Sequence, residues 1–352
     1  MPPHIVGVGS LISVVVIWTV SNYVIPSLSA QDQTWGSPFV INYVNCFFLL
    51  FFFVFSLLPD PLQHYAMAVK NKTGGPDTSI DSLDKNPESA CKKKVLGKGA
   101  ILMIGFPFAV LYFAANYFSV ASFTLTYPSS ASILSTSSGL FSLIIGRIFR
   151  VEDLSVFKFI SVLLTLLGVI LLQAFEMGQA NASNLQPLKG NCFSLVAAFL
   201  YGCYSTYLKK IVGEGDDELV SGSLMFAMVG FFTLTVFWPG FLCIHFLSDG
   251  GRLDHLPSGK MIGLLVVNAL VGTVIPNYAW TAAIMFTSSV LVAVGISFIS
   301  PLSLIIDWFY NTPLPLYKVA SMFLMLVGFI FINLASVKPH LDFIILPRKN
   351  SK

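Results

Sequence analysis

Long apolar segments with almost no charged residues recur along the whole chain, and they restrict the fold more than any other feature. Most of them are close to the roughly 20 residues that an α-helix needs to cross a bilayer. The ten segments cover residues 5–25, 38–58, 98–119, 127–147, 154–174, 189–210, 219–246, 258–280, 285–306 and 315–336. The sequence therefore predicts an all-α integral membrane protein with ten transmembrane helices.

The composition excludes a soluble domain of this length. Of the 352 residues, 55% are hydrophobic and only 11% are charged, and the mean hydropathy is +0.78. A soluble domain carries about 25% charged residues because its surface faces water. The net charge of +3 is small and says nothing by itself about nucleic acid. No DNA-binding motif is found, and no nucleic-acid partner is expected.

Basic residues lie mostly on one side of the predicted spans. The only long polar stretch, residues 60–98, is read as a flexible loop, and residues 337–352 form a basic tail. Cytoplasmic loops carry an excess of Lys and Arg, so both termini are predicted to be cytosolic. The loop lysines that carry this bias are Lys70, Lys72, Lys85, Lys92, Lys93, Lys94 and Lys98.

The chain also resembles itself. With an offset of 161 residues, Asn116-Tyr117 matches Asn277-Tyr278, and residues 142–145 match residues 303–306 as Ser-Leu-Ile-Ile. With an offset of 160, Gly168 matches Gly328. Two repeats are therefore predicted, over residues 1–174 and 175–336. Each holds five helices, an odd number, so the second would be inverted in the membrane, as in many secondary transporters.

Four stretches resemble the drug/metabolite transporter superfamily of EamA-like proteins. They are residues 17–23 (Ile-Trp-Thr-Val-Ser-Asn-Tyr), 115–117 (Ala-Asn-Tyr), 132–138 (Ser-Ile-Leu-Ser-Thr-Ser-Ser) and 300–308 (Ser-Pro-Leu-Ser-Leu-Ile-Ile-Asp-Trp). Within it they look like solute carrier family 35, subfamily F, and its fungal vacuolar relatives. The resemblance implies alternating access without ATP and a central cavity lined by the first, third, fourth, sixth, eighth and ninth helices.

Polar side chains within the apolar segments are the candidates for binding substrate. Amides and phenols can hydrogen-bond and stack on a flat ligand, but they also hold helices together in lipid. Hydroxyl groups of the fourth segment could line the same cavity, although Ser and Thr often bond their own backbone. The candidate substrate-binding residues are Asn22, Tyr23, Asn116, Tyr117, Ser132, Thr136, Asn277 and Tyr278.

Charged residues within membranes are costly and usually functional. No Asp or Glu lies in the middle of a predicted span, which argues against a central proton relay and favours exchange or facilitated movement. The candidates for a gate or ion contact are Asp307, Lys158 and Lys209, all near the ends of segments. The alternative for Asp307 is an interfacial residue that meets water.

The leading functional hypothesis is a secondary transporter of a small organic metabolite. The first alternative is a Golgi nucleotide-sugar antiporter, in which lysines would meet the phosphates. A membrane-embedded enzyme or scaffold is the alternative of another class, but no catalytic motif, cofactor site or metal-ligand spacing is found. A vacuolar or Golgi membrane is favoured over the plasma membrane, and a homodimer is compatible with the sequence.

Overall fold

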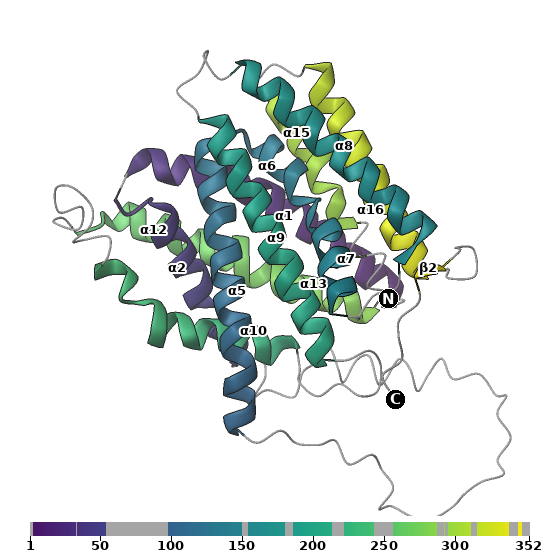
Figure 1. The fold of residues 1–352 in the computed structure, drawn as a ribbon. Helices are drawn as coiled ribbons and strands as arrows, with labels where there is room; N and C mark the ends of the chain where they lie inside the picture. Colours follow the sequence, from purple (N-terminus) through teal and green to yellow (C-terminus); the bar gives the residue numbers. More distant parts are fainter. Residues whose placement is uncertain are drawn as a thin grey trace, which may run out of the picture.

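A computed structural model describes most of the predicted spans. The described residues are 3–32, 34–53, 98–149, 154–179, 186–212, 222–242, 256–286, 292, 295–310, 315–337 and 344–346. The predicted flexible loop lies outside them except for Lys98, and so does most of the predicted tail. Helices account for nearly all of the described chain (Figure 1).

Helices overlap all five spans predicted in the first half of the chain. The fourth span is divided into two short helices by a turn at residues 136–137. The helices are α1 (Pro3–Gln31), α2 (Pro38–Phe48), α5 (Lys98–Leu125), α6 (Pro128–Ser135), α7 (Ser138–Ile148) and α8 (Val156–Gln179).

The second half contains two π-helical segments, a type that is rare and often found at functional sites. They continue the seventh and eighth predicted spans without a break in the helical path. The elements are α9 (Pro187–Val212), α10 (Gly222–Phe232), η2 (Thr233–Phe237), α12 (Gly259–Ala269), η3 (Leu270–Val274), α13 (Ile275–Phe286), α15 (Ile299–Phe309) and α16 (Leu316–Val337).

Four helices of the described chain are long and apolar enough to cross a membrane, judged by length and composition. They cover Ile5–Gln31, Ile101–Leu125, Pro128–Ile148 and Gly259–Ala283, and five shorter apolar helices accompany them. The fold is therefore that of a helical membrane protein. The count of ten spans stays a prediction.

Several helices continue beyond the predicted ends, among them α8 to Gln179 and α13 to Phe286. The first helix continues through Pro26 to Gln31, and α5 continues to Leu125 rather than ending near residue 119. The predicted restart at Pro128 is found, because Tyr127 has an extended backbone and proline occupies the first turn of α6, where its missing N–H costs nothing.

A minimal strand pair, which was not predicted, joins the tail to the helical bundle. Strand β1 (Leu154–Ser155) pairs antiparallel with β2 (Ile344–Leu346), and Leu154 lies opposite Leu346. Strands of two and three residues are too short to produce a recognisable alternating pattern.

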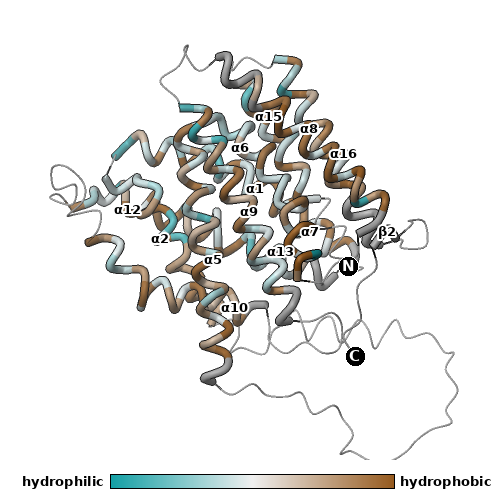
Figure 2. The backbone as a smooth tube through the Cα atoms, viewed as in Figure 1, coloured by the Kyte–Doolittle hydropathy of each residue, from teal (hydrophilic) through white to brown (hydrophobic). Residues whose placement is uncertain are grey.

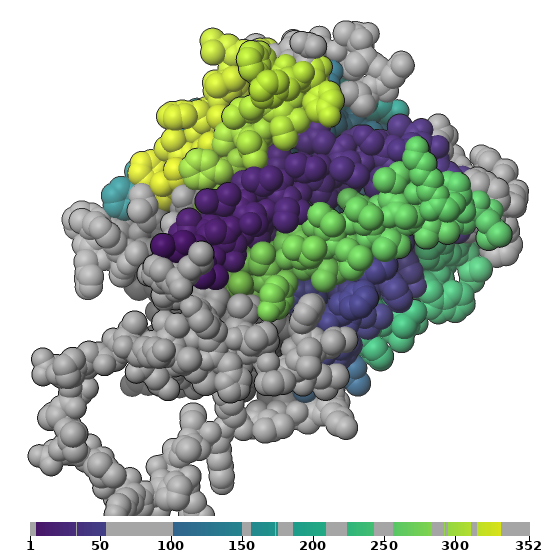
Figure 3. Space-filling view, turned by 180° about the vertical axis from the view of Figure 1, so that it is seen from behind, coloured from purple at the N-terminus to yellow at the C-terminus, as the bar shows by residue number. Residues whose placement is uncertain are grey.

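Hydrophobic residues occur along most of the helices (Figure 2), and many of their large apolar side chains are exposed. Seen from behind, α1 crosses the molecule between α15 and α16 on one side and α12 and α13 on the other (Figure 3). Its exposed side chains include Ile5, Val8, Ile12, Val16 and Val20, spaced three or four residues apart on one helical face. Such a stripe is suited to contact with lipid.

The longest interhelical contact joins α8 and α16, which lie side by side (Figure 1). Gly168 of α8 faces Met325 and the carbonyl oxygen of Ser321, which would lie 2.7 and 3.0 Å from an added Cβ. Gly328 of α16 faces Thr165 Oγ1 at 2.6 Å and a carbonyl oxygen of α8 at 2.9 Å. Only glycine permits so close an approach of the two backbones.

Candidate functional site

Asn116 lies at the contact between α5 and α9. Its amide nitrogen donates to the carbonyl oxygen of Tyr112 at 2.9 Å, one turn earlier in its own helix. Its amide oxygen accepts a hydrogen bond from the hydroxyl group of Tyr201 in α9, at 3.0 Å. The side chain therefore links two helices, one from each predicted half.

Asn277 repeats part of this arrangement in α13. Its amide nitrogen donates to the carbonyl oxygen of Thr273 at 2.7 Å, again one turn earlier. The amide also contacts the hydroxyl group of Tyr112, and the side chain is 6% exposed. The two predicted amides thus converge on Tyr112, Asn116 on its backbone and Asn277 on its side chain.

Aromatic rings surround this pair of amides. The Tyr204 ring centroid lies 5.5 Å from those of Tyr112 and Tyr201, and Phe226 lies 5.7 Å from Tyr112. Aromatic rings at these separations pack edge-to-face or stacked. The half-buried Tyr278 packs against the same cluster. The cluster combines ring faces with amide groups, which is the chemistry that holds a planar polar molecule.

Two other predicted residues lie at the edge of this region. The half-buried Tyr117 makes an edge contact with Phe118, with ring centroids 5.4 Å apart. Asn22 lies on the face of α1 that carries the buried Val15 and Thr19. Its amide has no hydrogen-bond partner among the described residues and keeps its polar atoms accessible. Asn22 is therefore available to an outside molecule.

The two predicted hydroxyl groups of the fourth span hold helices together. The Ser132 carbonyl oxygen accepts from Ser300 Oγ at 3.0 Å, and its hydroxyl accepts from Ser303 Oγ at 3.3 Å. Thr136 Oγ1 donates to the carbonyl oxygen of Ile133 at 2.7 Å and contacts Met325 Sδ at 3.6 Å. In this conformation Ser132 contacts α15 and Thr136 contacts α16, and their role in lining a cavity stays a prediction.

Tyr23 and Asp307 form a latch between α1 and α15. The Tyr23 hydroxyl lies 2.6 Å from Asp307 Oδ1 and 2.5 Å from the carbonyl oxygen of Ser303. The other carboxyl oxygen of Asp307 accepts a hydrogen bond from Ser129, at the start of α6. Asp307 is 2% exposed, so it is not the water-facing residue that the alternative interpretation described. We call Tyr23, Ser129 and Asp307 the latch.

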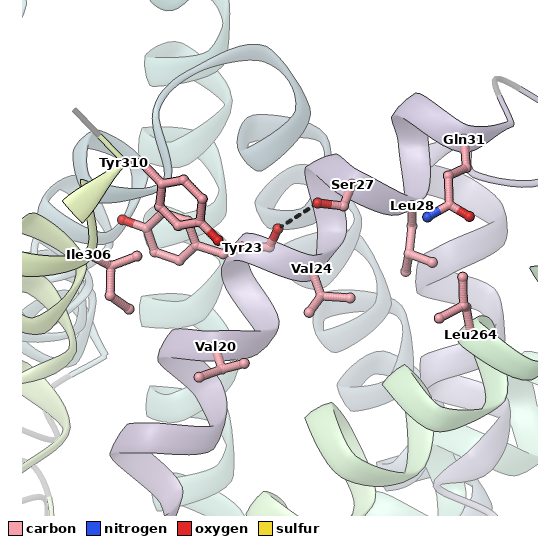
Figure 4. A pocket seen from close by; sticks show the side chains of 9 residues that line it. All are labelled: Val20, Tyr23, Val24, Ser27, Leu28, Gln31, Leu264, Ile306 and Tyr310. Carbon is pink, nitrogen blue, oxygen red and sulfur yellow. Dashed lines mark hydrogen bonds between the residues drawn. The ribbon is translucent and has the colours of Figure 1, made fainter. Parts of the chain in front are cut away.

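A cavity of about 300 Å³ adjoins the latch (Figure 4). The rings of Tyr23 and Tyr310 stack on one wall, with centroids 6.1 Å apart and planes inclined by 10°. Aliphatic and polar side chains of α1, α12 and α15 complete the lining, namely Val20, Val24, Ser27, Leu28, Gln31, Leu264 and Ile306. The Tyr23 ring therefore belongs to the cavity wall while its hydroxyl group belongs to the latch.

The candidate lysines differ in their surroundings. Lys158 is buried in α8, with 6% of its surface exposed. Its counterpart Lys318 is 3% exposed, and its ammonium lies 4.5 Å from the ring centroid of Tyr127, a cation–π contact. The backbone of Lys209 belongs to α9, but its side chain lies outside the described residues.

A second polar network was not singled out from the sequence. Ser21 Oγ donates to Asn268 Oδ1 at 3.1 Å, and Asn268 Nδ2 donates to Asn45 Oδ1 at 3.1 Å. It joins α1, α2 and α12 directly before the π-helical segment η3. The sequence did carry a signal for this network. Asn45 and Asn268 each place an amide in an apolar segment, and a buried amide in lipid needs a hydrogen-bond partner.

The apolar helical bundle with buried polar clusters between its helices is that of an integral membrane protein. A model of the EamA-like transporter family matches residues 188–334. The chain is 32% identical to an uncharacterized transporter of Schizosaccharomyces pombe, over 94% of this chain and 96% of the relative. It belongs to the EamA-like transporter family, within the drug/metabolite transporter superfamily.

Other relatives agree with this membership. An uncharacterized vacuolar membrane protein of Saccharomyces cerevisiae is 30% identical, over 94% of this chain and 90% of the relative. Solute carrier family 35 member F5 of Bos taurus is 30% identical, over 59% of this chain and 39% of the relative. A solved crystal structure at 12% identity shares the fold, with a TM-score of 0.50, over 94% of this chain and 98% of that chain. Membership of this family points to membrane transport as the general function.

Proposed function

We propose that this chain moves a small organic solute across a membrane by alternating access between two inverted five-helix repeats, without ATP hydrolysis. The amide–tyrosine cluster of Asn116, Tyr112, Tyr201 and Asn277 is the substrate site of the proposal, with Asn22 as a further contact. The latch of Tyr23, Ser129 and Asp307 closes one end of the path.

The reciprocal contact between α8 and α16 is the observation that carries this proposal. Gly168 meets the Ser321 carbonyl and Met325, while Gly328 meets the Ser161 carbonyl and Thr165. With the offset of 160, Ser161 corresponds to Ser321 and Thr165 corresponds to Met325. Each residue in the first contact therefore has its counterpart in the second. Reciprocal contacts of this kind are what a two-fold axis produces. They support a pair of repeats that face each other across this axis.

The pairing of helices supports the same symmetry. In the proposed repeat, α1 corresponds to α9 and α5 corresponds to α13. The contact between α5 and α9 then has its counterpart in the contact between α13 and α1. Both Asn116 and Asn277 lie in these corresponding helices and make the same bond to a carbonyl oxygen one turn earlier. Substrate sites of inverted-repeat transporters lie between the repeats, where these amides are.

The substrate class we propose is a planar, polar ring compound. Tyrosine faces provide stacking surfaces and the amides provide donors and acceptors. A buried lysine such as Lys158, at 6% exposure, offers little surface to the phosphates of a nucleotide sugar, so the Golgi antiporter ranks second. The vacuolar membrane relative supports an endomembrane location, and we propose that both termini are cytosolic.

Counterflow in proteoliposomes tests this function. The purified chain is reconstituted, loaded with an unlabelled compound and supplied with labelled compound outside, over a panel of thiamine, purine bases and nucleotide sugars. We expect exchange of a ring compound without phosphate. Exchange of nucleotide sugars alone would favour the Golgi antiporter, and uptake that requires ATP would contradict secondary transport.

A further inference from the structure

The cavity beside the latch opens onto the lipid-facing side of α1. Val20 lines the cavity and is 51% exposed, and it belongs to the exposed apolar stripe that begins at Ile5. The walls come from α1, α12 and α15 (Figure 4), and all three helices lie in apolar segments. The cavity is therefore continuous with a surface suited to contact with lipid.

The cavity lies at the ends of two helices. Gln31 is the last residue of α1 and Tyr310 directly follows α15, and both line the cavity. Trp308, Phe309 and Tyr310 are consecutive in the chain and exposed. Tryptophan and tyrosine gather at the boundary between the hydrocarbon and the headgroups of a bilayer, so this aromatic run indicates that the cavity is close to headgroup level.

The chemistry of the lining changes from one end of the cavity to the other. On α1 the lining positions are three or four residues apart and share a face, with Val20 and Val24 at one end and Ser27 and Gln31 at the other. The two valines offer only hydrocarbon contact. Gln31 is exposed, and an amide group can donate hydrogen bonds to the oxygen atoms of a ligand. An occupant with an apolar chain and an oxygen-rich polar part matches this lining.

A planar ring compound or water matches the cavity less well. The rings of Tyr23 and Tyr310 already stack on each other, with centroids 6.1 Å apart and planes inclined by 10°, so the ring faces between them are occupied. Water needs polar partners, and the valine end has none, because the Tyr23 hydroxyl is bonded within the latch. Hydrocarbon from the bilayer regains the dispersion contacts that an empty space would lose.

We propose that the cavity is a binding site for one membrane phospholipid. The phosphate and ester oxygens would lie near Gln31 and Tyr310, and an acyl chain would leave over Val20 and continue along the exposed stripe of α1. The volume of about 300 Å³ is at the lower end of the range for ligand sites, so the cavity holds part of the lipid while the rest stays in the bilayer. A lipid site here does not depend on the proposed transport function.

Recognition should depend on the shape of the lipid and not on the charge of its headgroup. No charged side chain is among the described residues that line the cavity. Phosphatidylcholine and phosphatidylglycerol should therefore bind within about twofold of each other. A preference of about fivefold or more for the anionic lipid would contradict this site, since that is the effect expected of a nearby Lys or Arg.

Photolabelling of the full chain in lipid nanodiscs tests the proposal. The nanodiscs contain phosphatidylcholine and a small fraction of a phosphatidylcholine whose acyl chain carries a diazirine near the ester group. Mass spectrometry then locates the adducts after irradiation. Adducts should concentrate on residues 20–31, Leu264 and Ile306, which line the cavity from three helices, and should be sparse on residues 5–16 of the stripe.

Two substitutions on α1 form a matched pair. Ser27→Phe fills the cavity and should lower the labelling of residues 20–31 by about fivefold or more. Ser13→Phe is the control and should leave this labelling within about twofold. Both serines are exposed and donate to the carbonyl oxygen one turn earlier, but only Ser27 lines the cavity.

A milder variant keeps the test decisive if Ser27→Phe fails to unfold cooperatively on heating. Gln31→Leu preserves the size of the side chain and removes its hydrogen-bond donors. It should lower the labelling by about threefold, as expected for the loss of one hydrogen bond.

Three results would overturn the proposal. One is labelling spread evenly over residues 5–31, which would show only the lipid that surrounds any bundle. Another is equal labelling of the wild type, Ser27→Phe and Gln31→Leu. The third is displacement of the lipid probe by a ring compound that the protein exchanges in counterflow, which would assign the cavity to the substrate. Failure to exchange any compound, with the labelling pattern intact, would count against the proposed function alone.

Discussion

At the residue scale, several polar side chains inside this bundle have partners on other helices. Asn116 reaches Tyr201, Tyr23 reaches Asp307, and Asn268 joins Ser21 to Asn45. An unpaired polar group in lipid costs several kcal/mol. A side chain that binds substrate must therefore exchange its hydrogen bond to another residue for one to the substrate. The accessible amide of Asn22 has no hydrogen-bond partner among the described residues.

Replacing Asn116 or Asn277 by alanine should lower transport of the panel compound by about tenfold or more in kcat/KM, the effect of losing one or two hydrogen bonds at roughly 1 kcal/mol each. Ser13→Ala is the control, because Ser13 is on the exposed face of α1 and bonds only its own helix at Gly9. Unchanged kinetics in both asparagine variants and in Tyr278→Ala, at normal expression, would remove the cluster as the substrate site.

Removing the amide of Asn268 should destabilise the bundle more than it changes substrate recognition. Asn268→Ala leaves Ser21 and Asn45 without their shared partner, at a cost of about 1–3 kcal/mol. Thermal unfolding in detergent should move to lower temperature, while the KM for the panel compound changes little. A large rise in KM with unchanged unfolding would instead assign Asn268 to the substrate site.

At the element scale, close helix contacts and interrupted helices organise the molecule. Glycines bring α8 and α16 together, the fourth span is divided between α6 and α7, and π-helical turns interrupt the seventh and eighth. Such irregular segments bend more easily than continuous α-helix. We therefore expect rearrangement at these places during transport.

Alanine at Gly168 or Gly328 should separate α8 from α16. The added methyl group would lie within 2.7 Å of Met325 in one case and 2.6 Å of Thr165 in the other, and overpacking of this kind costs about 1–3 kcal/mol. Differential scanning fluorimetry should show similar losses for both variants. Gly263→Ala is the matched control, since its Cβ would meet nothing within 4 Å, and an equal loss there would contradict the packing argument.

At the scale of the whole molecule, many large apolar side chains of the described helices are exposed, and polar side chains such as Asn268, Asn277 and Asp307 are buried. The proposed topology places the lysine-rich stretch and both termini on one side of the membrane. The cytosolic excess of lysine and arginine supports this orientation.

Epitope tags at the two ends test this orientation. In sealed vesicles with the cytosolic face outward, added protease should remove both tags, because an even number of spans returns the chain to its starting side. Protection of one tag alone would require an odd number of spans. A luminal tag that becomes accessible only after detergent treatment is the control for vesicle integrity.

The apolar segments predicted the location of nearly every helix, because lipid demands long hydrophobic runs whatever their neighbours are. The break at Thr136, the π-helical segments and the β1–β2 pair were not predicted, because they depend on contacts between distant segments. Among site residues, Tyr23 and Asp307 were named separately as substrate and gate candidates, and the structure joins them in one latch. Tyr112 and Tyr201 were missed, since a tyrosine in an aromatic-rich span gives no distinguishing pattern.

The sequence by itself determined that this protein lies in a membrane, which segments are helical and which family it resembles, because these follow from local hydrophobicity and motif identity. Only the tertiary structure decided which polar groups meet. Tyr23 and Asp307 are separated by most of the chain, as are Ser21 and Asn268, and no local pattern encodes such distances. They are set by the packing of helices, and close contacts such as those of Gly168 with Met325 and of Gly328 with Thr165 are part of that packing.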